Sequence, residues 1–336
     1  MNGWTRTRDF MAGKPVDRTP FHPMVMRFAA RHAGIPYRAY CLDYRAKCEG
    51  ALRTAADYQS DWVATMSDPY AEAEAFGLMV DYPENNLPQE RGHLLESAAA
   101  AERLKQPDPS SAPRLLARVH EIEEFRRRAG DTLMISGWVE GPLAEYADLR
   151  GLGEACLDLY DDPERIRITF RLLLDTAREF ARAQVAAGAH CIGIGDAACS
   201  QIGPELYREF CQPLQAELVA DLHALGARVK LHICGNTSSI LPDMLATGAD
   251  IVDVDHLVPS LAPFVSMLRP GQVFWGKSDP VRMIQNGTPE EIRADVRRNR
   301  AEAENRMINA AGCEITPDTP PQNLRALRDA SDSGKA

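Results

Sequence analysis

The sequence has neither the long apolar runs of a membrane protein nor the paired cysteines of a disulfide-rich one. No stretch approaches the roughly 18 consecutive apolar residues that a membrane span needs. The first six residues show no apolar core of the kind found in signal peptides. The eight cysteines have no close paired spacings, so we expect reduced thiols in a cytoplasmic protein.

Long basic runs are also missing, and residues 126–128 form the most notable arginine tract. The chain has 38 Lys and Arg against 48 Asp and Glu, which gives a net charge of -10. A protein with this balance has no basic face for a nucleic-acid backbone, so we expect no nucleic-acid partner. The sequence shows no internal repeat and no low-complexity tract, which argues against a solenoid or a disordered linker.

The chain does have a repeated order of short apolar runs and longer amphipathic stretches. Strands are predicted at residues 21–26, 61–66, 132–139, 191–195, 228–234, 250–255, 272–276 and 313–315. Helices lie between them, for example at residues 164–188 and 204–225. Eight such units predict an α/β fold, a (β/α)8 TIM barrel, as a single domain over residues 1–336. Residues 81–131 exceed a simple connection and predict a helical insertion after the second strand, with helices at 98–104 and 115–128.

The pattern His232-Ile233-Cys234, together with the distant Cys313, predicts a zinc site. Residues i and i+2 of a strand point to the same face, so the His232 imidazole and the Cys234 thiol would share one cavity. Cys313 would complete a set of three ligands and leave the fourth position to water or substrate, as catalytic zinc requires. The alternative is a chance His-x-Cys pattern with cysteines buried in the core.

Residues with reactive side chains follow most of the predicted strands. In chain order they are His22 or Arg27, Asp68, Glu140, Asp196, His232 with Cys234, Asp255 with His256, Lys277 with Asp279, and Cys313. Active sites of TIM barrels lie at the carboxyl ends of the strands. The three candidate zinc ligands therefore fall where this architecture places catalytic residues.

Several segments resemble the uroporphyrinogen decarboxylase superfamily, over nearly the whole chain. The landmarks are residues 11–20, Ser67-Asp68-Pro69, Gly141-Pro142-Leu143, residues 202–210 with Pro213, and residues 276–280. Two sharper segments, residues 231–237 and 312–323, are similar to the zinc- and corrinoid-dependent methyltransferase branch, in which a His, a Cys and a distant Cys bind zinc. The resemblance thus implies that His232, Cys234 and Cys313 hold zinc.

The same resemblance implies the reaction. Such proteins move a methyl group between a small O-, N- or S-methylated compound and the cobalt of a corrinoid (cobalamin), and zinc acts on the heteroatom. In this branch the corrinoid is carried on a separate protein, so the resemblance implies a small corrinoid-binding partner protein. The oligomeric state is left open, with a homodimer among the alternatives.

Supporting roles are expected for six further residues. Glu140 could be a weak fourth zinc ligand or a proton-handling group, and Asp68 a second catalytic group. Asp255 could also orient the ligand imidazole. The substrate-binding candidates are Arg27, Lys277, Asp196 and Asp255. Each of these residues also has a structural alternative, as a helix cap, an ion pair or a buried hydrogen-bonded group.

The substrate and the direction of transfer have competing interpretations. Demethylation of a methoxylated aromatic is favoured, because Arg27 and Lys277 could hold an anionic ring substituent. Methylation of a thiol is the close second. The decarboxylase branch is a rival, since residues 26–31 resemble its arginine-bearing segment and Asp68 matches its central aspartate, although Phe28 and Ala30 replace the usual Gln and Gly. A non-catalytic zinc- or tetrapyrrole-binding barrel is the third interpretation.

Overall fold

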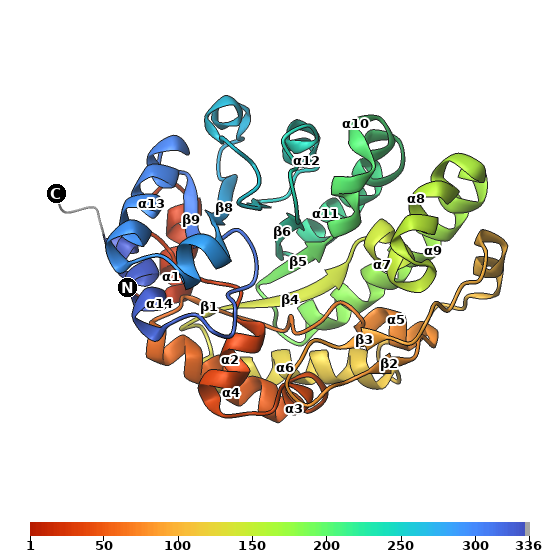
Figure 1. The fold of residues 1–336 in the computed structure, drawn as a ribbon, viewed down its shortest axis with the longest axis horizontal. Helices are drawn as coiled ribbons and strands as arrows, with labels where there is room; N and C mark the ends of the chain where they lie inside the picture. The colour runs from red at the N-terminus through yellow and green to blue at the C-terminus, as the bar shows by residue number, and fades with distance from the viewer. Residues whose placement is uncertain (333–336) are drawn as a thin grey trace.

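A curled parallel sheet lies at the centre of the structure, and helices surround it (Figure 1). The computed structural model describes residues 1–332. Neighbouring strands follow the chain order β1-β4-β5-β6-β7-β8-β9, and every pair is parallel. The strands are β1 Trp62–Ala64, β4 Met134–Glu140, β5 Cys191–Gly195, β6 Arg228–Ile233, β7 Ile251–Val254, β8 Val273–Ser278 and β9 Met307–Ala311. This arrangement confirms the TIM-barrel prediction.

The first predicted strand is reduced to one residue, Phe21, which fills the place between β9 and β1. Phe21 forms a parallel bridge with Asn309 of β9, and its carbonyl accepts a hydrogen bond from Asp61 at 2.8 Å. Pro23 has no N–H to continue the ladder, so the strand ends there. The prediction of a strand over residues 21–26 was therefore too long, because helix α2 already begins at Met26.

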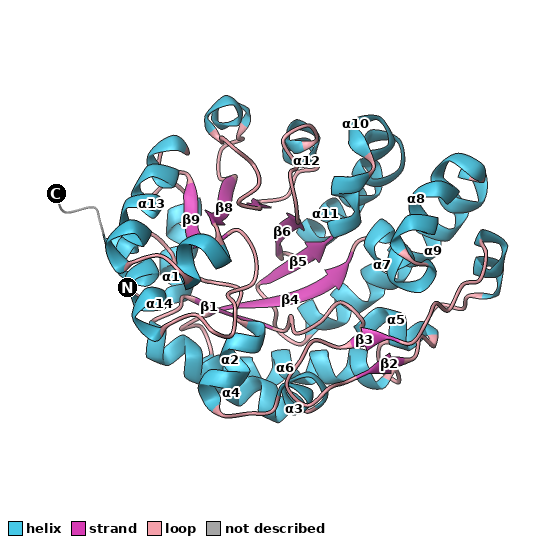
Figure 2. Cartoon of the chain, viewed as in Figure 1, coloured by secondary structure: helices cyan, strands magenta, loops and turns pink. Residues whose placement is uncertain are grey.

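The helices cover the outer face of the sheet (Figure 2). They are α1 Gly3–Met11, α2 Met26–Ala33, α3 Tyr37–Leu42, α4 Tyr44–Tyr58, α5 Ala71–Phe76, α6 Pro113–Ala129, α7 Pro142–Arg150, α8 Leu152–Asp161, α9 Pro163–Ala186, α10 Gly203–Leu206, α11 Gln212–Ala224, α12 Leu241–Ala246, α13 Pro289–Glu302 and α14 Pro321–Asp329. Local sequence sets their ends: Asp162 caps the backbone N–H of Arg165, and Gly188 closes α9 with φ of 111°. Over residues 1–332, none of these helices is long and apolar enough to cross a membrane.

The segment between β1 and β4 differs from the predicted helical insertion. It holds the short helix α5, a two-stranded hairpin of β2 (Val80–Asp81) and β3 (Gln89–Glu90), and the 3-10 helix η1 (Ala98–Arg103). Helix α6, which the prediction assigned to the insertion, packs on β4, α4 and α9. It is thus the crossover helix between the parallel strands β1 and β4. A separate helical insertion near the barrel mouth is not confirmed.

The last strand lies earlier in the chain than predicted. Residues 307–311 pair with β8, from Phe274↔Met307 to Ser278↔Ala311, whereas residues 313–315 lie beyond the sheet. The backbone N–H of Ile315 donates instead to the carbonyl of Met24 at 2.7 Å. Cys313 therefore lies on the loop after β9 and not on a strand. The prediction of a strand at residues 313–315 was therefore wrong, but Cys313 still lies at the carboxyl end of the barrel.

Candidate metal centre

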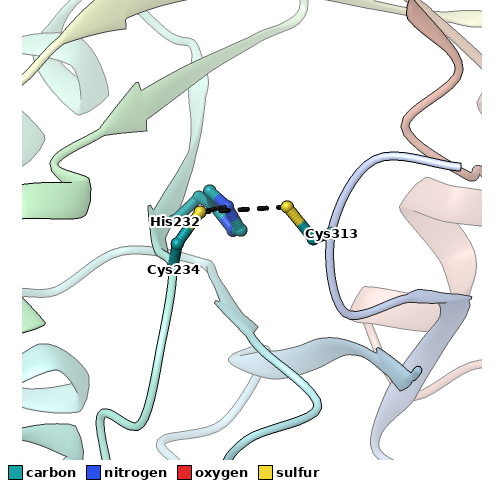
Figure 3. Close-up of side chains that lie close together, drawn as sticks. All are labelled: His232, Cys234 and Cys313. Atoms are coloured by element: carbon teal, nitrogen blue, oxygen red, sulfur yellow. Dashed lines mark hydrogen bonds between the residues drawn. The ribbon is translucent and has the colours of Figure 1, made fainter. Parts of the chain in front are cut away.

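His232, Cys234 and Cys313 come together at the carboxyl end of the barrel (Figure 3). His232 is the second-to-last residue of β6, Cys234 follows the strand, and Cys313 faces them from the loop after β9. The Nε2 atom of His232 is 2.9 Å from the Cys234 sulfur, and the two sulfur atoms are 3.9 Å apart. All three ligand atoms lie within 4.8 Å of one another.

The distance between the two sulfur atoms fits a tetrahedral zinc ion, and the distance from His232 to Cys234 is somewhat short for one. Zn–S bonds of about 2.3 Å place two thiolates roughly 3.8 Å apart, which matches the spacing of Cys234 and Cys313. A His nitrogen and a sulfur on one zinc lie roughly 3.5 Å apart, so a small rotation of His232 away from Cys234 would admit the metal. Two sulfurs and one imidazole form a donor set that zinc prefers, and it leaves one position for another ligand.

The loop that carries Cys313 approaches the barrel closely at a glycine. A side chain on Gly312 would place its Cβ 2.4 Å from the backbone nitrogen of His256, so no larger residue fits there. On the other side of the site, Asp255 accepts hydrogen bonds from the backbone N–H groups of Gly235 at 2.9 Å and Leu257 at 3.0 Å. Asp255 thus fixes the turn that follows Cys234.

Asp253 supports the His232 imidazole from the neighbouring strand. The register of β6 and β7 places Asp253 opposite His232, and its carboxylate lies 3.2 Å from Nδ1 of the ring. Lys230 donates to the same carboxylate at 3.0 Å, and its ammonium lies 4.3 Å from the centre of the Trp275 ring. A carboxylate on Nδ1 leaves Nε2 free to face a metal and makes the imidazole a better ligand.

The three side chains of the site shift one another's pKa values. The hydrogen bond with Cys234 is the main cause that lowers the pKa of Cys313 to about 5, and His232 adds to it. The same bond and burial raise the pKa of Cys234 above its usual range. Burial disfavours a charged His232, but Cys234 and Asp253 outweigh it and raise the pKa of the ring. A metal ion would displace these protons, as thiolate and neutral imidazole ligands require.

Two predicted substrate-binding residues lie near the site but have partners within the protein. Arg27 forms hydrogen bonds from Nε and a terminal nitrogen to Glu314, both at 3.3 Å, and its backbone N–H donates to the same carboxylate. Lys277 donates to the carbonyls of Val258 at 2.8 Å and Pro259 at 3.0 Å. These contacts favour structural roles, since Arg27 anchors the Cys313 loop through Glu314.

Asp68 is fully buried in an ion pair. Arg114 donates to both carboxylate oxygens, at 2.7 and 2.6 Å, and Arg118 lies 3.7 Å away. Burial favours the protonated acid, but the two arginines outweigh it and lower the pKa of Asp68 to about 2. The pair ties the loop after β1 to helix α6, which supports a structural role for this residue.

Asp196 is likewise fully buried. Its carboxylate accepts hydrogen bonds from the backbone of Ala144 and the side chain of Gln215, both at 2.8 Å. Cys199 and Cys211 lie close enough to share an ion with it, but these hydrogen bonds already occupy both carboxylate oxygens. The contacts support a role in holding helix α7 in place.

Glu140 ends β4 within a group of buried acids. Its carboxylate accepts a hydrogen bond from the indole of Trp138 at 2.7 Å, and its backbone N–H donates to Glu72 at 3.0 Å. Burial, Glu72 and Asp148 raise the pKa of Glu140 well above its usual range. The raised pKa favours the protonated form of Glu140, which is the form that a proton-donating group needs.

The sequence did not single out Asp253, Lys230 or Glu314. The run from Asp250 to Asp255 places acids at alternate positions, and strand pairing decides which one meets the imidazole. We had expected Asp255 in this role, but the register gives it to Asp253. Glu314 could have been identified from the sequence as a candidate site residue, because it directly follows Cys313.

Comparisons with known proteins agree with this geometry. The family model "Uroporphyrinogen decarboxylase (URO-D)" matches residues 4–333. A methylcobamide:CoM methyltransferase, MtbA, of Methanosarcina acetivorans is 28% identical over 272 residues, or 77% of this chain and 76% of the relative. A uroporphyrinogen decarboxylase of Xanthomonas axonopodis pv. citri is 26% identical, over 94% of both chains.

A solved methyltransferase from Methanosarcina mazei shares the fold, with a TM-score of 0.89 and 21% identity over the full length of both chains. The family match and the barrel lead to one assignment. The chain belongs to the uroporphyrinogen decarboxylase family.

Proposed function

We propose that this protein is a zinc-dependent methyltransferase that moves a methyl group between a small-molecule heteroatom and the cobalt of a corrinoid on a separate protein. The observation that carries the proposal is the cluster of His232, Cys234 and Cys313, with ligand atoms within 4.8 Å of one another. The methylcobamide:CoM methyltransferase among its relatives supports the corrinoid partner.

The residues of the chain suit this chemistry. When bound there, zinc supplies a Lewis acid that stabilises negative charge on the substrate heteroatom. His232 is held by Asp253, and Cys313 is held by a loop that Gly312 and Glu314 fix. Glu140 is proposed to carry the proton that the heteroatom gains or loses. The open fourth position then admits substrate.

Decarboxylation is the less favoured alternative for this chain. A decarboxylase needs arginines free to grip substrate carboxylates, but Arg27 pairs with Glu314 and Arg31 pairs with Asp318. Asp68 is neutralised by Arg114 and is not exposed. The contacts thus leave the three residues that suggested decarboxylation engaged within the protein.

The direction of transfer depends on the substrate. A methoxylated aromatic donor was favoured because Arg27 and Lys277 could hold an anion, and the internal partners of both residues weaken that argument. Methylation of a thiol gains support from the name of the relative, whose acceptor is coenzyme M. Both directions use the same open site and predict the same metal dependence.

The test combines metal analysis with corrinoid spectroscopy. The full chain should hold about one zinc, and with cob(I)alamin and a methyl donor it should form methyl-cobalt, seen as a change in corrinoid absorbance. In the reverse test, methylcobalamin and a thiol should show the opposite change. Cys313→Ala should lose both zinc and turnover, whereas Cys156→Ala, on helix α8 away from the site, should keep them.

Full zinc retention in Cys313→Ala would refute the metal assignment. Release of carbon dioxide from uroporphyrinogen by the chelated protein would refute methyl transfer in favour of decarboxylation.

A further inference from the structure

A cavity of about 450 Å³ lies at the amino end of the barrel, opposite the metal centre. Helix α1, the last turn of α6, and the turns that follow α9 and α11 form its wall, together with the start of β6. Strand β6 carries Arg228 at its first position and His232 four residues later, which separates the two sites by about 13 Å along the strand. The cavity is therefore distinct from the metal centre.

Three arginines line this cavity, and among residues 1–332 no acidic side chain does. Each arginine has one acidic partner outside the wall: Arg8 bonds Asp9 at 3.0 Å, Arg126 bonds Asp131 at 2.6 Å, and Arg228 bonds Asp250 at 2.7 Å. Each of these bonds uses a single nitrogen. Within the described part of the chain, no protein group accepts a hydrogen bond from Nη2 of any of the three arginines. Guanidinium groups with unused N–H groups are suited to bind phosphate.

Asp131 shows where an oxyanion fits beside this cavity. The backbone N–H of Ile135 donates to Nδ1 of His190 at 3.1 Å, so a neutral His190 ring carries its hydrogen on Nε2. Oδ1 of Asp131 lies 3.6 Å from that Nε2 and 2.6 Å from Nη1 of Arg126. Two N–H donors thus converge on one carboxylate oxygen, and the Asp131 side chain that supplies it is largely exposed.

The position of Arg126 depends on a glycine. A side chain on Gly188 would place its Cβ 2.5 Å from Cγ of Arg126, so only glycine lets the arginine lie along the cavity wall. The turn after α11 is open at Gly226, where an added Cβ would meet no atom within 4 Å.

The rest of the wall is mainly apolar. Trp4, Val185 and Leu225 line it, and the indole of Trp4 stacks on the ring of His190 with 4.2 Å between centroids. The volume falls within the roughly 300–1,000 Å³ that is typical of small-molecule sites, and a bare phosphate ion would fill only a small part of it. The cavity therefore suits an anion that also carries an apolar ring.

We propose that this cavity binds a small organic phosphate with a flat ring, of the nucleotide class. The phosphate lies among Arg8, Arg126 and Arg228, and the ring lies against Trp4, Val185 and Leu225. The inference does not depend on the proposed methyl transfer, because none of the three candidate zinc ligands lines the cavity.

The experiment measures binding of adenosine 5′-monophosphate to the full chain by isothermal titration calorimetry. Arg126→Gln should weaken binding by about tenfold, because it removes charge-assisted hydrogen bonds. Arg127→Gln, on an exposed pair with Glu124 at the next position of the same helix, is the matched control and should bind normally. Asp131→Asn should strengthen binding by about two- to fivefold, since it removes a carboxylate that competes for Arg126.

Two partial probes test the two halves of the ligand. Adenosine lacks the phosphate and inorganic phosphate lacks the ring, so each should bind more weakly than the nucleotide. Equal binding of the nucleotide and either partial probe would overturn the proposal.

Equal affinities of Arg126→Gln and Arg127→Gln, or weaker binding by Asp131→Asn, would also overturn it. If circular dichroism shows that Arg126→Gln is misfolded, Arg8→Gln takes its place with the same expected loss, because the Arg8 side chain is half exposed. The zinc content should be the same in all of these variants, which separates this site from the metal centre.

Discussion

Asp253 shows how one residue can matter without touching a metal. Its carboxylate lies 3.2 Å from Nδ1 of His232 and accepts a hydrogen bond from the ammonium of Lys230. The side chain is almost fully buried. Burial favours the protonated acid, but His232 and Lys230 outweigh it and lower the pKa of Asp253. A buried negative charge on the far nitrogen strengthens the imidazole as a metal ligand.

We predict that Asp253→Asn weakens zinc binding by about 10- to 100-fold, because the amide keeps the shape of the side chain but not its charge. Competition with a chelator at fixed pH measures the affinity directly. Asp243→Asn, on a partly exposed pair with Arg208, is the control and should bind zinc normally. An unchanged affinity in Asp253→Asn would remove this residue from the metal centre.

At the scale of elements, the crossover helix α6 is fixed to the barrel by buried charge. Asp68 follows β1, and Arg114 and Arg118 project from α6 to meet it. The Arg118 guanidinium also donates to the backbone carbonyls of Thr65 at 3.3 Å and Asp68 at 2.6 Å. The pairing holds the long segment between β1 and β4 against the barrel.

The low pKa of Asp68 predicts a dependence of stability on pH. Its pKa falls from 3.8 to about 2 on folding, so its stabilisation is complete above about pH 4 and is lost as pH falls toward 2. The shift corresponds to about 2 kcal/mol, and breaking the buried pair costs about 3–5 kcal/mol. Urea unfolding should show that Asp68→Asn is less stable at pH 7 and has a flatter profile below pH 4.

Asp81→Asn, on the exposed pair with Arg91, is the control and should behave like the unmodified protein. Parallel profiles for Asp68→Asn and the unmodified chain below pH 4 would contradict the assigned role of Asp68.

For the molecule as a whole, the metal centre joins two segments that are 79 residues apart in the chain. Cys234 follows β6, whereas Cys313 follows β9, and strands β7 and β8 lie between them in the sheet. The barrel core itself is a cluster of buried apolar side chains that does not include the three ligands. Metal should therefore add stability to a barrel that folds without it.

We predict that saturating zinc raises the Tm by several degrees, since a ligand at 100 times its Kd adds about 2.7 kcal/mol. Chelation should return the protein to the Tm of its metal-free form, with circular dichroism still showing a folded barrel. Cys313→Ala should melt at one temperature with or without zinc. A zinc-dependent Tm in that variant would place the stabilising metal elsewhere.

Local patterns in the sequence were enough to predict the barrel. Six of the eight predicted strands coincide with observed ones to within about two residues, because each is a short apolar run bounded by polar or glycine residues. The helix over residues 164–188 was equally visible from Asp162 and Gly188 at its ends. The triad was predicted too, since His232 and Cys234 share a strand end and Cys313 stands in a distinctive segment.

Long-range packing decided what the sequence could not. Arg27, Lys277 and Asp68 were charged residues at strand ends, and only their partners showed that each is engaged within the protein. The shortening of the first strand depends on Pro23 and on pairing across the barrel. Charge and strand propensity are properties of single residues and short windows, whereas partner choice and register depend on which distant segments meet. The sequence by itself thus determined the barrel and its triad, and the tertiary structure alone decided that Asp253 supports His232.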